Sequence, residues 1–269
     1  ETMVTRFHGI DRHKKYSTIS VLDRDGRETR FLRSCRMEAY LAELGPEDAD
    51  VMEASCGSFY WADRVEATGA TCYVLDPMRF RIITDSWNKT DRQDARNMAK
   101  ALWVFLVTGE FGIPTVYKPS ETIRTLRRLF ASYTLLKRQI RMLKNTIQAM
   151  LAEDGVVLCS TDRSRLFKGT ESVSEILADH HLWEVIVEAL QIQVDLLRTT
   201  NESKERLGRR IVEASAPLNE QIRLLITIPG ITPLTASAFL ADAGDVHRFP
   251  SLRRMNAYLG LVPRCHDSG

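Results

Sequence analysis

The chain has 269 residues, and its 37 Lys and Arg against 35 Asp and Glu give a formal net charge of only +2. With 44% hydrophobic and 27% charged residues, it has the composition of an ordinary soluble globular protein that is long enough for two domains. No apolar run reaches the roughly 18–20 residues that cross a membrane, and no signal-peptide pattern is present. Five scattered cysteines without a CxxC pair argue against disulfides and a zinc ribbon, so we expect a cytoplasmic protein with no membrane partner.

Residues 3–112 alternate strand and helix patterns. Taken in chain order, we predict strands at 4–11, 16–23 and 27–35, a helix at 37–45, a strand at 50–55, a helix at 58–69, a strand at 71–77, and a helix that Asp91 and Asp94 open. The turn DRDG joins the second and third strands into an antiparallel hairpin. The order βββαβαβα predicts an α/β domain with a mixed sheet, whose later strands are parallel and joined by helical crossovers.

Residues 118–213 are almost wholly helical, and apolar residues recur there at spacings of three and four. The apolar seam consists of Leu126, Leu129, Tyr133, Leu136, Ile140, Leu143, Ile147 and Met150. Such a pattern predicts a coiled coil. The seam can pair with a second helical pattern through Leu190, Val194 and Leu197, or with another subunit, and a single clean seam favours a homo-oligomer.

Positive charge is concentrated in two places. Residues 118–148 carry eight Lys or Arg against one acid, and a second basic cluster lies near the end of the chain. This distribution indicates a polyanion partner, although a solvated helix face explains it equally well. The candidate nucleic-acid-binding residues are Arg124, Arg127, Arg128, Lys137, Arg138, Arg141, Lys144, Arg253, Arg254 and Arg264.

Residues 218–269 contain two predicted short helices that flank the turn PGIT. This arrangement resembles a helix-hairpin-helix, in which main-chain N–H groups of a tight turn contact a DNA phosphate. The usual pattern has a second glycine where Thr232 stands. An ordinary helix pair with a Pro-Gly turn is therefore the alternative.

Four acids of the first segment occupy suggestive places. Asp11 ends the first strand, Glu53 lies in the fourth, and Asp91 and Asp94 are three residues apart at a helix start. In a sheet of this order the first and fourth strands are commonly neighbours, and positions i and i+3 share a helix face. Four carboxylates at one place repel each other without a cation, and hard oxygen ligands suit Mg²⁺ or Mn²⁺. The alternative is that Asp91 and Asp94 only stabilise the helix dipole and that Asp11 lies at the surface.

The chain resembles the DEDD insertion-sequence transposases in four stretches. They are GIDRHKKYSTISVLD, MEASCGSFYWADRV, KTDRQDARNMAK and the C-terminal block from IPGITPLT to AYLGLVPR. These are also known as bridge-RNA-guided recombinases and are related to site-specific DNA invertases. The resemblance implies a RuvC-like RNase H fold at residues 3–112, a helical coiled-coil segment at 118–213 and a C-terminal transposase domain at 218–269.

The resemblance also implies residue roles. Asp11, Glu53, Asp91 and Asp94 would hold Mg²⁺, with Mn²⁺ able to substitute, and Ser268 would be the nucleophile that forms a phosphoserine link to DNA. The implied partners are donor and target DNA, a noncoding guide RNA and further copies of the chain, acting at a prokaryotic nucleoid. Family members continue beyond Gly269, so we expect the sequence to be partial.

Two other functions fit the same residues. One is a metal-dependent nuclease of the Holliday-junction type, which uses activated water instead of a serine. The other is a non-catalytic nucleic-acid scaffold. His13 follows Asp11 closely and either contacts phosphate or lies at the surface.

Overall fold

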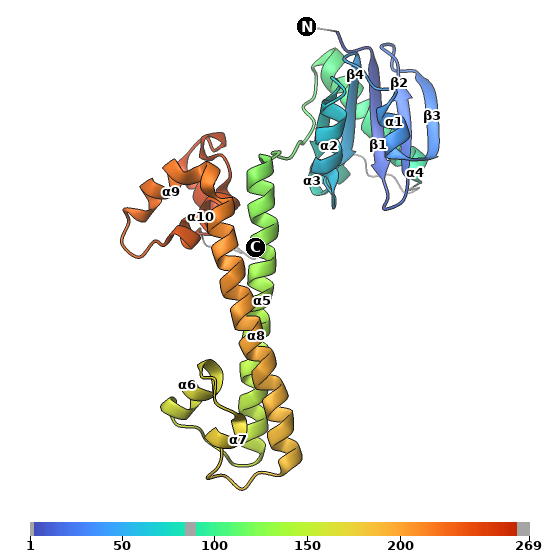
Figure 1. The fold of residues 1–269 in the computed structure, drawn as a ribbon. Coiled ribbons are helices and arrows are strands. Elements are labelled where there is room, and N and C mark those ends of the chain that lie inside the picture. The colour runs from blue at the N-terminus through green and yellow to red at the C-terminus, as the bar shows by residue number, and fades with distance from the viewer. Residues whose placement is uncertain (1–2, 84–89, 263–269) are drawn as a thin grey trace, which may run out of the picture. The chain divides into compact units, whose positions relative to one another are not determined.

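A computed structural model of the chain describes residues 3–83 and 90–262, with the side chains of 81–83 left aside. The chain folds into two compact units, Glu1–Lys118 and Pro119–Gly269 (Figure 1). Among the described residues, no helix is both long and apolar enough to cross a membrane.

The first unit is built on a five-stranded mixed sheet (Figure 1). The strands are β1 (Arg6–Arg12), β2 (Ser17–Leu22), β3 (Glu28–Cys35), β4 (Asp48–Glu53) and β5 (Thr71–Leu75). Their order across the sheet is β3-β2-β1-β4-β5. β1 is antiparallel to β2 and parallel to β4, and β4 is parallel to β5. This confirms the expected mixed sheet, including the pairing of the first and fourth strands.

Helices cover both faces of this sheet. They are α1 (Met37–Leu41), α2 (Ser58–Glu66), α3 (Pro77–Ile83) and α4 (Asp91–Trp103), which the π-helix η1 (Val104–Thr108) continues. Met98, Ala99 and Leu102 of α4 share a core with Phe7, Val51 and Leu75 of the sheet. Met37, Tyr40 and Ala62, from α1 and α2, pack on the opposite face against Ile10, Ile19 and Met52. The short helix α3 was not predicted, while the other elements match their expected types.

Alternation along β1 decides which side chains face α4. Because successive side chains of a strand point to opposite faces, Phe7, Gly9 and Asp11 share one face and His8 and Ile10 share the other. Phe7 is buried in the core beneath α4. A Cβ atom added to Gly9 would lie 1.9 Å from the carbonyl oxygen of Ala95, so β1 and α4 are in backbone contact there. Glycine at this position therefore brings the start of α4 close to Asp11.

The second unit is helical. Its elements are α5 (Glu121–Glu153), α6 (Ser160–Lys168), α7 (Val173–Ile176), α8 (Glu184–Ala214), the 3-10 helix η2 (Ala216–Leu218), α9 (Asn219–Ile226), α10 (Pro233–Ala243), the 3-10 helix η3 (Val246–Arg248) and α11 (Leu252–Tyr258). The long helices α5 and α8 lie side by side (Figure 1). Ile147 packs near Leu190 and Leu126 packs near Ile211, so the two helices are antiparallel.

The predicted apolar seam of α5 faces this intramolecular contact. Every seam residue from Leu126 to Met150 is buried or half-buried. Leu190, Val194 and Leu197 of α8 lie in the core that includes Ile140 and Ile147. Of the two alternatives for the seam, pairing within the chain is thus observed. Association with another subunit stays a prediction.

Two helices flank the PGIT turn, as expected. They are α9 and α10, and Thr232 is the N-cap of α10, where its Oγ1 accepts a hydrogen bond from the Thr235 backbone N–H at 3.2 Å. A capping threonine is a good local reason for a residue other than glycine at this position. Contact of the turn with a nucleic-acid backbone stays a prediction.

Candidate metal centre and nucleic-acid surface

The ends of β1 and β4 place two acids beside one another. Ile10 pairs with Met52 in the parallel β1–β4 ladder, and Asp11 and Glu53 are the next residues of the two strands. Both strands alternate so that Asp11 and Glu53 project on the face that α4 covers, because Phe7 and Val51 of that face lie in the shared core. The sheet edge therefore offers carboxylates to the start of α4.

The beginning of α4 supplies the third and fourth acids. Thr90 is the N-cap, and its side chain accepts from the Gln93 backbone N–H at 3.2 Å. The capping hydrogen bond is thus made by a threonine, and Asp91 and Asp94 are left in the first turn, where the helix dipole favours negative charge. Because Thr90 caps the helix, the carboxylates of Asp91 and Asp94 are not needed for capping and can make other contacts.

His13 joins the acids of the two elements. Its Nε2 lies 3.2 Å from Oδ2 of Asp11 and 3.2 Å from Oδ2 of Asp91. One ligand atom from each of the three residues lies within 4.8 Å of the others, which makes them a possible metal-binding group. Sequence reasoning left His13 open. The signal that could have found it is its position two residues after Asp11, on the same face of the chain.

Burial and like charge act together on Asp11. Its side chain is 25% exposed. Burial raises the pKa of Asp11, the neighbouring His13 lowers it, and the charges of Asp91 and Asp94 raise it, with a net upward shift. Two carboxylates and an imidazole nitrogen thus converge at this place, and the charges of Asp91 and Asp94 add to the effect of burial on Asp11. A bound cation would favour the ionised form of Asp11 against this burial and repulsion, so the residues present fit a divalent metal.

The predicted tetrad is therefore only partly gathered. Asp11 and Asp91 belong to the close group with His13, whereas the ligand atoms of Glu53 and Asp94 lie outside it. Asp94 is near enough for its charge to act on the pKa of Asp11. Glu53 is held at the end of β4, next to a loop that Arg12 fixes by hydrogen bonds to Ser55 Oγ (3.1 Å) and to the Cys56 carbonyl oxygen.

The basic residues of α5 fall into two groups. Arg128, Lys137, Arg138 and Arg141 are exposed, whereas Arg124, Arg127 and Lys144 are half-buried. Arg127 donates to the carbonyl oxygens of Ala241 (2.7 Å) and Asp242 (3.1 Å) at the end of α10, and the Lys144 ammonium lies 5.5 Å from the ring centre of Phe167. The exposed group is the better candidate surface for a polyanion.

The remaining predicted residues lie near the end of the chain. Arg253 and Arg254 are exposed on α11. Arg264 and the predicted nucleophile Ser268 lie outside the described residues. Their roles therefore stay predictions.

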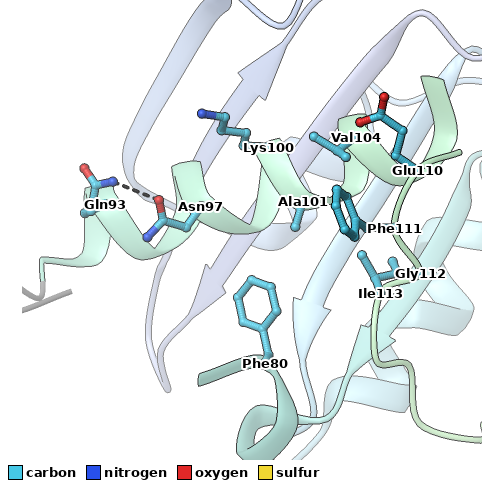
Figure 2. A pocket seen from close by; sticks show the side chains of 10 residues that line it. All are labelled: Phe80, Gln93, Asn97, Lys100, Ala101, Val104, Glu110, Phe111, Gly112 and Ile113. Carbon is cyan, nitrogen blue, oxygen red and sulfur yellow. Dashed lines mark hydrogen bonds between the residues drawn. The ribbon is translucent and has the colours of Figure 1, made fainter. Parts of the chain in front are cut away.

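A pocket of about 780 Å³ lies on another face of α4 (Figure 2). Gln93 and Asn97 of α4 and Val104 of η1 line one side of it, and Phe80 and Phe111 line others. Gln93 donates to the side-chain oxygen of Asn97 at 2.8 Å. None of the four predicted acids lines this pocket, so we assign it no part in the metal centre.

Two family models match the chain. A DEDD transposase model matches residues 8–154, and the model of the Transposase IS116/IS110/IS902 family matches residues 222–269. The first match covers the sheet apart from the first two residues of β1, both acids of its edge and the start of α4, and it spans more than half of the chain. The chain therefore belongs to the IS110/IS116 family of DEDD transposases.

Relatives from several bacteria support this assignment. A probable family 20 transposase of Pseudomonas aeruginosa is 27% identical over 266 residues, which is 99% of this chain and 73% of that protein. The transposase for insertion sequence element IS1111A of Coxiella burnetii is 27% identical over 273 residues, 97% of this chain and 69% of that protein. The pilin gene-inverting protein of Moraxella bovis is 35% identical over 104 residues, covering 34% of this chain and 32% of that protein.

Proposed function

We propose that this protein is a DNA transposase of an insertion sequence, which cuts and rejoins DNA by a metal-assisted reaction. The observation that carries this proposal is the meeting of Asp11, His13 and Asp91 at one edge of the sheet. Membership of the DEDD transposase family and the similarity to transposases and a gene-inverting protein support it.

Asp11 and Asp91 are the residues best placed to hold the metal, with Glu53 and Asp94 at the border of the group. Their oxygens are the hard ligands that Mg²⁺ prefers, and Mn²⁺ takes similar ligands. A bound divalent cation polarises a phosphodiester and eases deprotonation of a nucleophile. The acids would bind and orient this cation, and the cation would offset the burial and the neighbouring acids that together raise the pKa of Asp11.

We further propose that Ser268 is the nucleophile. Its Oγ forms a bond to a DNA phosphorus atom while the bond from that phosphorus to a sugar oxygen breaks. The serine proton is lost to the surroundings, and the departing sugar oxygen gains a proton and becomes a hydroxyl. A sugar hydroxyl of another strand then attacks the phosphoserine, which restores the serine and joins the strands without ATP.

The proposed partners follow from charge and family. Arg138 and Arg141 are exposed on α5 and, among the described residues, make no ion pair. Such cations bind phosphates and release counterions, as DNA and RNA partners require. We propose donor DNA, target DNA and a noncoding guide RNA as the polyanions, and a homo-oligomer as the active assembly.

A covalent adduct tests the function. The protein is incubated with insertion-sequence end DNA and Mg²⁺, denatured and separated by electrophoresis. We expect a protein–DNA band that is absent for Ser268→Ala and for Asp11→Asn, while Ser251→Ala, an N-cap serine of α11, keeps it. A band that persists in Ser268→Ala rules out the serine mechanism. Cleavage without any adduct favours the nuclease that uses activated water, and Mn²⁺ binding unchanged by Asp11→Asn favours a scaffold without a metal centre.

A further inference from the structure

A second pocket, of about 500 Å³, borders the candidate metal centre. Asp91 is one of the residues that line it. Thr18 is another, and it lies directly opposite Asp11 in the β1–β2 ladder. The pocket and the metal centre therefore share a wall. Its volume is within the roughly 300–1,000 Å³ that small-molecule sites occupy.

A bulge in β3 shapes this pocket. Ser17 pairs with Cys35 and Ile19 pairs with Leu32, so one residue of β2, Thr18, stands opposite two residues of β3. Those two are Arg33 and Ser34, and Ser34 adopts φ 54°, which is uncommon for a residue other than glycine. Bulges next to functional sites redirect side chains, and strained backbone conformations are also concentrated at functional sites. Here Arg33 and Ser34 both line the pocket.

The lining side chains combine aromatic surface with positive charge. The Tyr16 ring packs against the His13 ring with their centres 4.7 Å apart. Arg92 lies over Phe31, 4.6 Å from the ring centre, and pairs with Glu28 at 2.9 Å. Arg33 is exposed and, within residues 3–83 and 90–262, makes no ion pair or hydrogen bond. The pocket thus contains a cation whose charge is not paired with any residue of the described part of the chain.

We propose that this pocket binds one unpaired nucleotide of the DNA strand that lies at the metal centre. The base contacts the rings of Tyr16 and Phe31, and the adjoining phosphate contacts Arg33. Aromatic side chains and a nearby cation are the groups that hold single-stranded nucleic acid. The nucleotide must be unpaired, because the faces of a base inside a duplex are covered by its neighbours. This inference rests on the proposed function, and it assigns to the β2–β3 hairpin the positioning of the strand to be cut.

The test is binding of a short oligonucleotide to the full chain. The affinity for a labelled 12-nucleotide single-stranded DNA is measured by fluorescence anisotropy in EDTA over a range of salt concentrations. We expect Arg33→Gln to lower the salt slope of the binding constant by about 0.7, the contribution of one contact to a single strand. Tyr16→Ala should weaken binding about tenfold, the loss of one stacked base. Arg30→Gln is the matched control, because Arg30 is an exposed arginine of the same strand that pairs with Glu43 outside the pocket.

Two further measurements separate this inference from the proposed function. Mn²⁺ affinity should be the same in wild type and Arg33→Gln, and lost in Asp91→Asn. Tyr16→Ala removes the ring that packs on His13, so thermal unfolding is used to check that both pocket variants are folded. A 5-iododeoxyuridine oligonucleotide should crosslink to the tryptic peptide that begins at Tyr16.

The inference is overturned if Arg33→Gln and Tyr16→Ala bind the single strand as Arg30→Gln does. It is equally overturned if Arg33→Gln and Tyr16→Ala weaken binding of a blunt duplex as much as they weaken binding of the single strand. A third contradicting result is an RNA 12-mer that binds more tightly than the DNA 12-mer and loses this advantage in Tyr16→Ala. If the wild type fails to bind Mn²⁺, the proposed metal centre is wrong, while the oligonucleotide data still decide the pocket.

Discussion

Asp50 belongs to a buried network on the opposite face of the sheet from the metal centre. It is fully buried on β4 and accepts a hydrogen bond from Tyr40, whose hydroxyl also lies 2.7 Å from His8 Nδ1. His8 Nε2 is 2.8 Å from Asp48 Oδ1. Burial raises the pKa of Asp50 to about 6. Burial also acts upward on Asp48, but hydrogen bonds from His8, Arg6 and the Gly45 N–H bring its pKa to about 2.

Asp50 should make the first unit less stable at neutral and alkaline pH. Its folded pKa of about 6 lies above the ordinary value of 3.8, so the folded state takes up a proton that the unfolded chain does not. Stability therefore rises as pH falls from above 6 toward 4. We expect Asp50→Asn to add roughly 3 kcal/mol to the free energy of unfolding at pH 8 and about half as much at pH 5, because Asp50 of the unfolded chain is still ionised at pH 5. Urea unfolding followed by hydrogen exchange in β1 and β4 measures this.

Asp48→Asn is the matched control for that measurement. Its carboxylate faces Arg6 and His8, and removing it leaves a partly buried cation without its partner, which destabilises. We expect a loss at both pH values. If Asp50→Asn shifts stability equally at pH 5 and pH 8, ionisation of Asp50 is not the source of the effect.

At the scale of elements, the contact between β1 and α4 determines the site. Asp11 is on β1 and Asp91 begins α4, so the spacing of these elements sets the distance between the two carboxylates. A Cβ atom on Gly9 would lie 1.9 Å from Ala95 O and 2.4 Å from Ala99 N. Both are backbone atoms, which cannot rotate away, so the helix itself must shift.

Gly9→Ala should therefore separate the two acids as well as destabilise the unit. We expect a loss of about 2–3 kcal/mol, the upper range for overpacking, together with weaker Mn²⁺ binding. Denaturant unfolding and Mn²⁺ titration measure the two effects. Gly112→Ala is the control, because a Cβ there has no atom within 4 Å, and it should change neither quantity. Normal Mn²⁺ affinity in Gly9→Ala would show that the β1–α4 spacing does not set the metal site.

At the scale of the whole molecule, the second unit exposes apolar side chains on its two long helices. Leu135 and Met142 of α5 are 52% and 61% exposed, and Ile192 and Leu196 of α8 are 61% and 52% exposed. Leu135 and Met142 are seven residues apart and so lie on one helix face, away from the buried seam. The buried seam is already used inside the chain, so it does not decide whether the protein self-associates. The exposed apolar surface on the other face supports the proposed homo-oligomer.

Charges on that face should disrupt self-association. We expect the wild-type chain to sediment as a dimer or larger species at micromolar concentration, and Leu135→Glu combined with Met142→Glu to reduce it to a monomer, because charges are costly to bury in a contact. Val157→Glu, which alters an 85% exposed residue outside both helices, should leave the assembly intact. A monomeric wild type, or an unaltered mass in the double variant, contradicts an interface on this face of α5.

Much of the protein could be predicted from short-range patterns. The strand and helix order of the first unit, the apolar seam of α5, and the placement of Asp11 and Asp91 at the ends of elements all depend on residues close together in the sequence. Periodicity and turn chemistry report such local features directly. The motifs around these acids also carried the family, which the matches at 8–154 and 222–269 confirm.

The contacts between segments that are distant in the chain could not be predicted from such patterns. In the tertiary structure, His13 lies between Asp11 and Asp91, and the apolar seam of α5 packs against α8. Arg127 donates a hydrogen bond at the end of α10, and Arg33 lines a pocket beside the carboxylates. These outcomes depend on strand register, a bulge and the close approach of β1 to α4, which join residues distant in the chain. Local patterns predict the elements and the acids that they carry, whereas the packing of distant segments sets which side chains share a site, because no local pattern reports the partner across a sheet or helix pair.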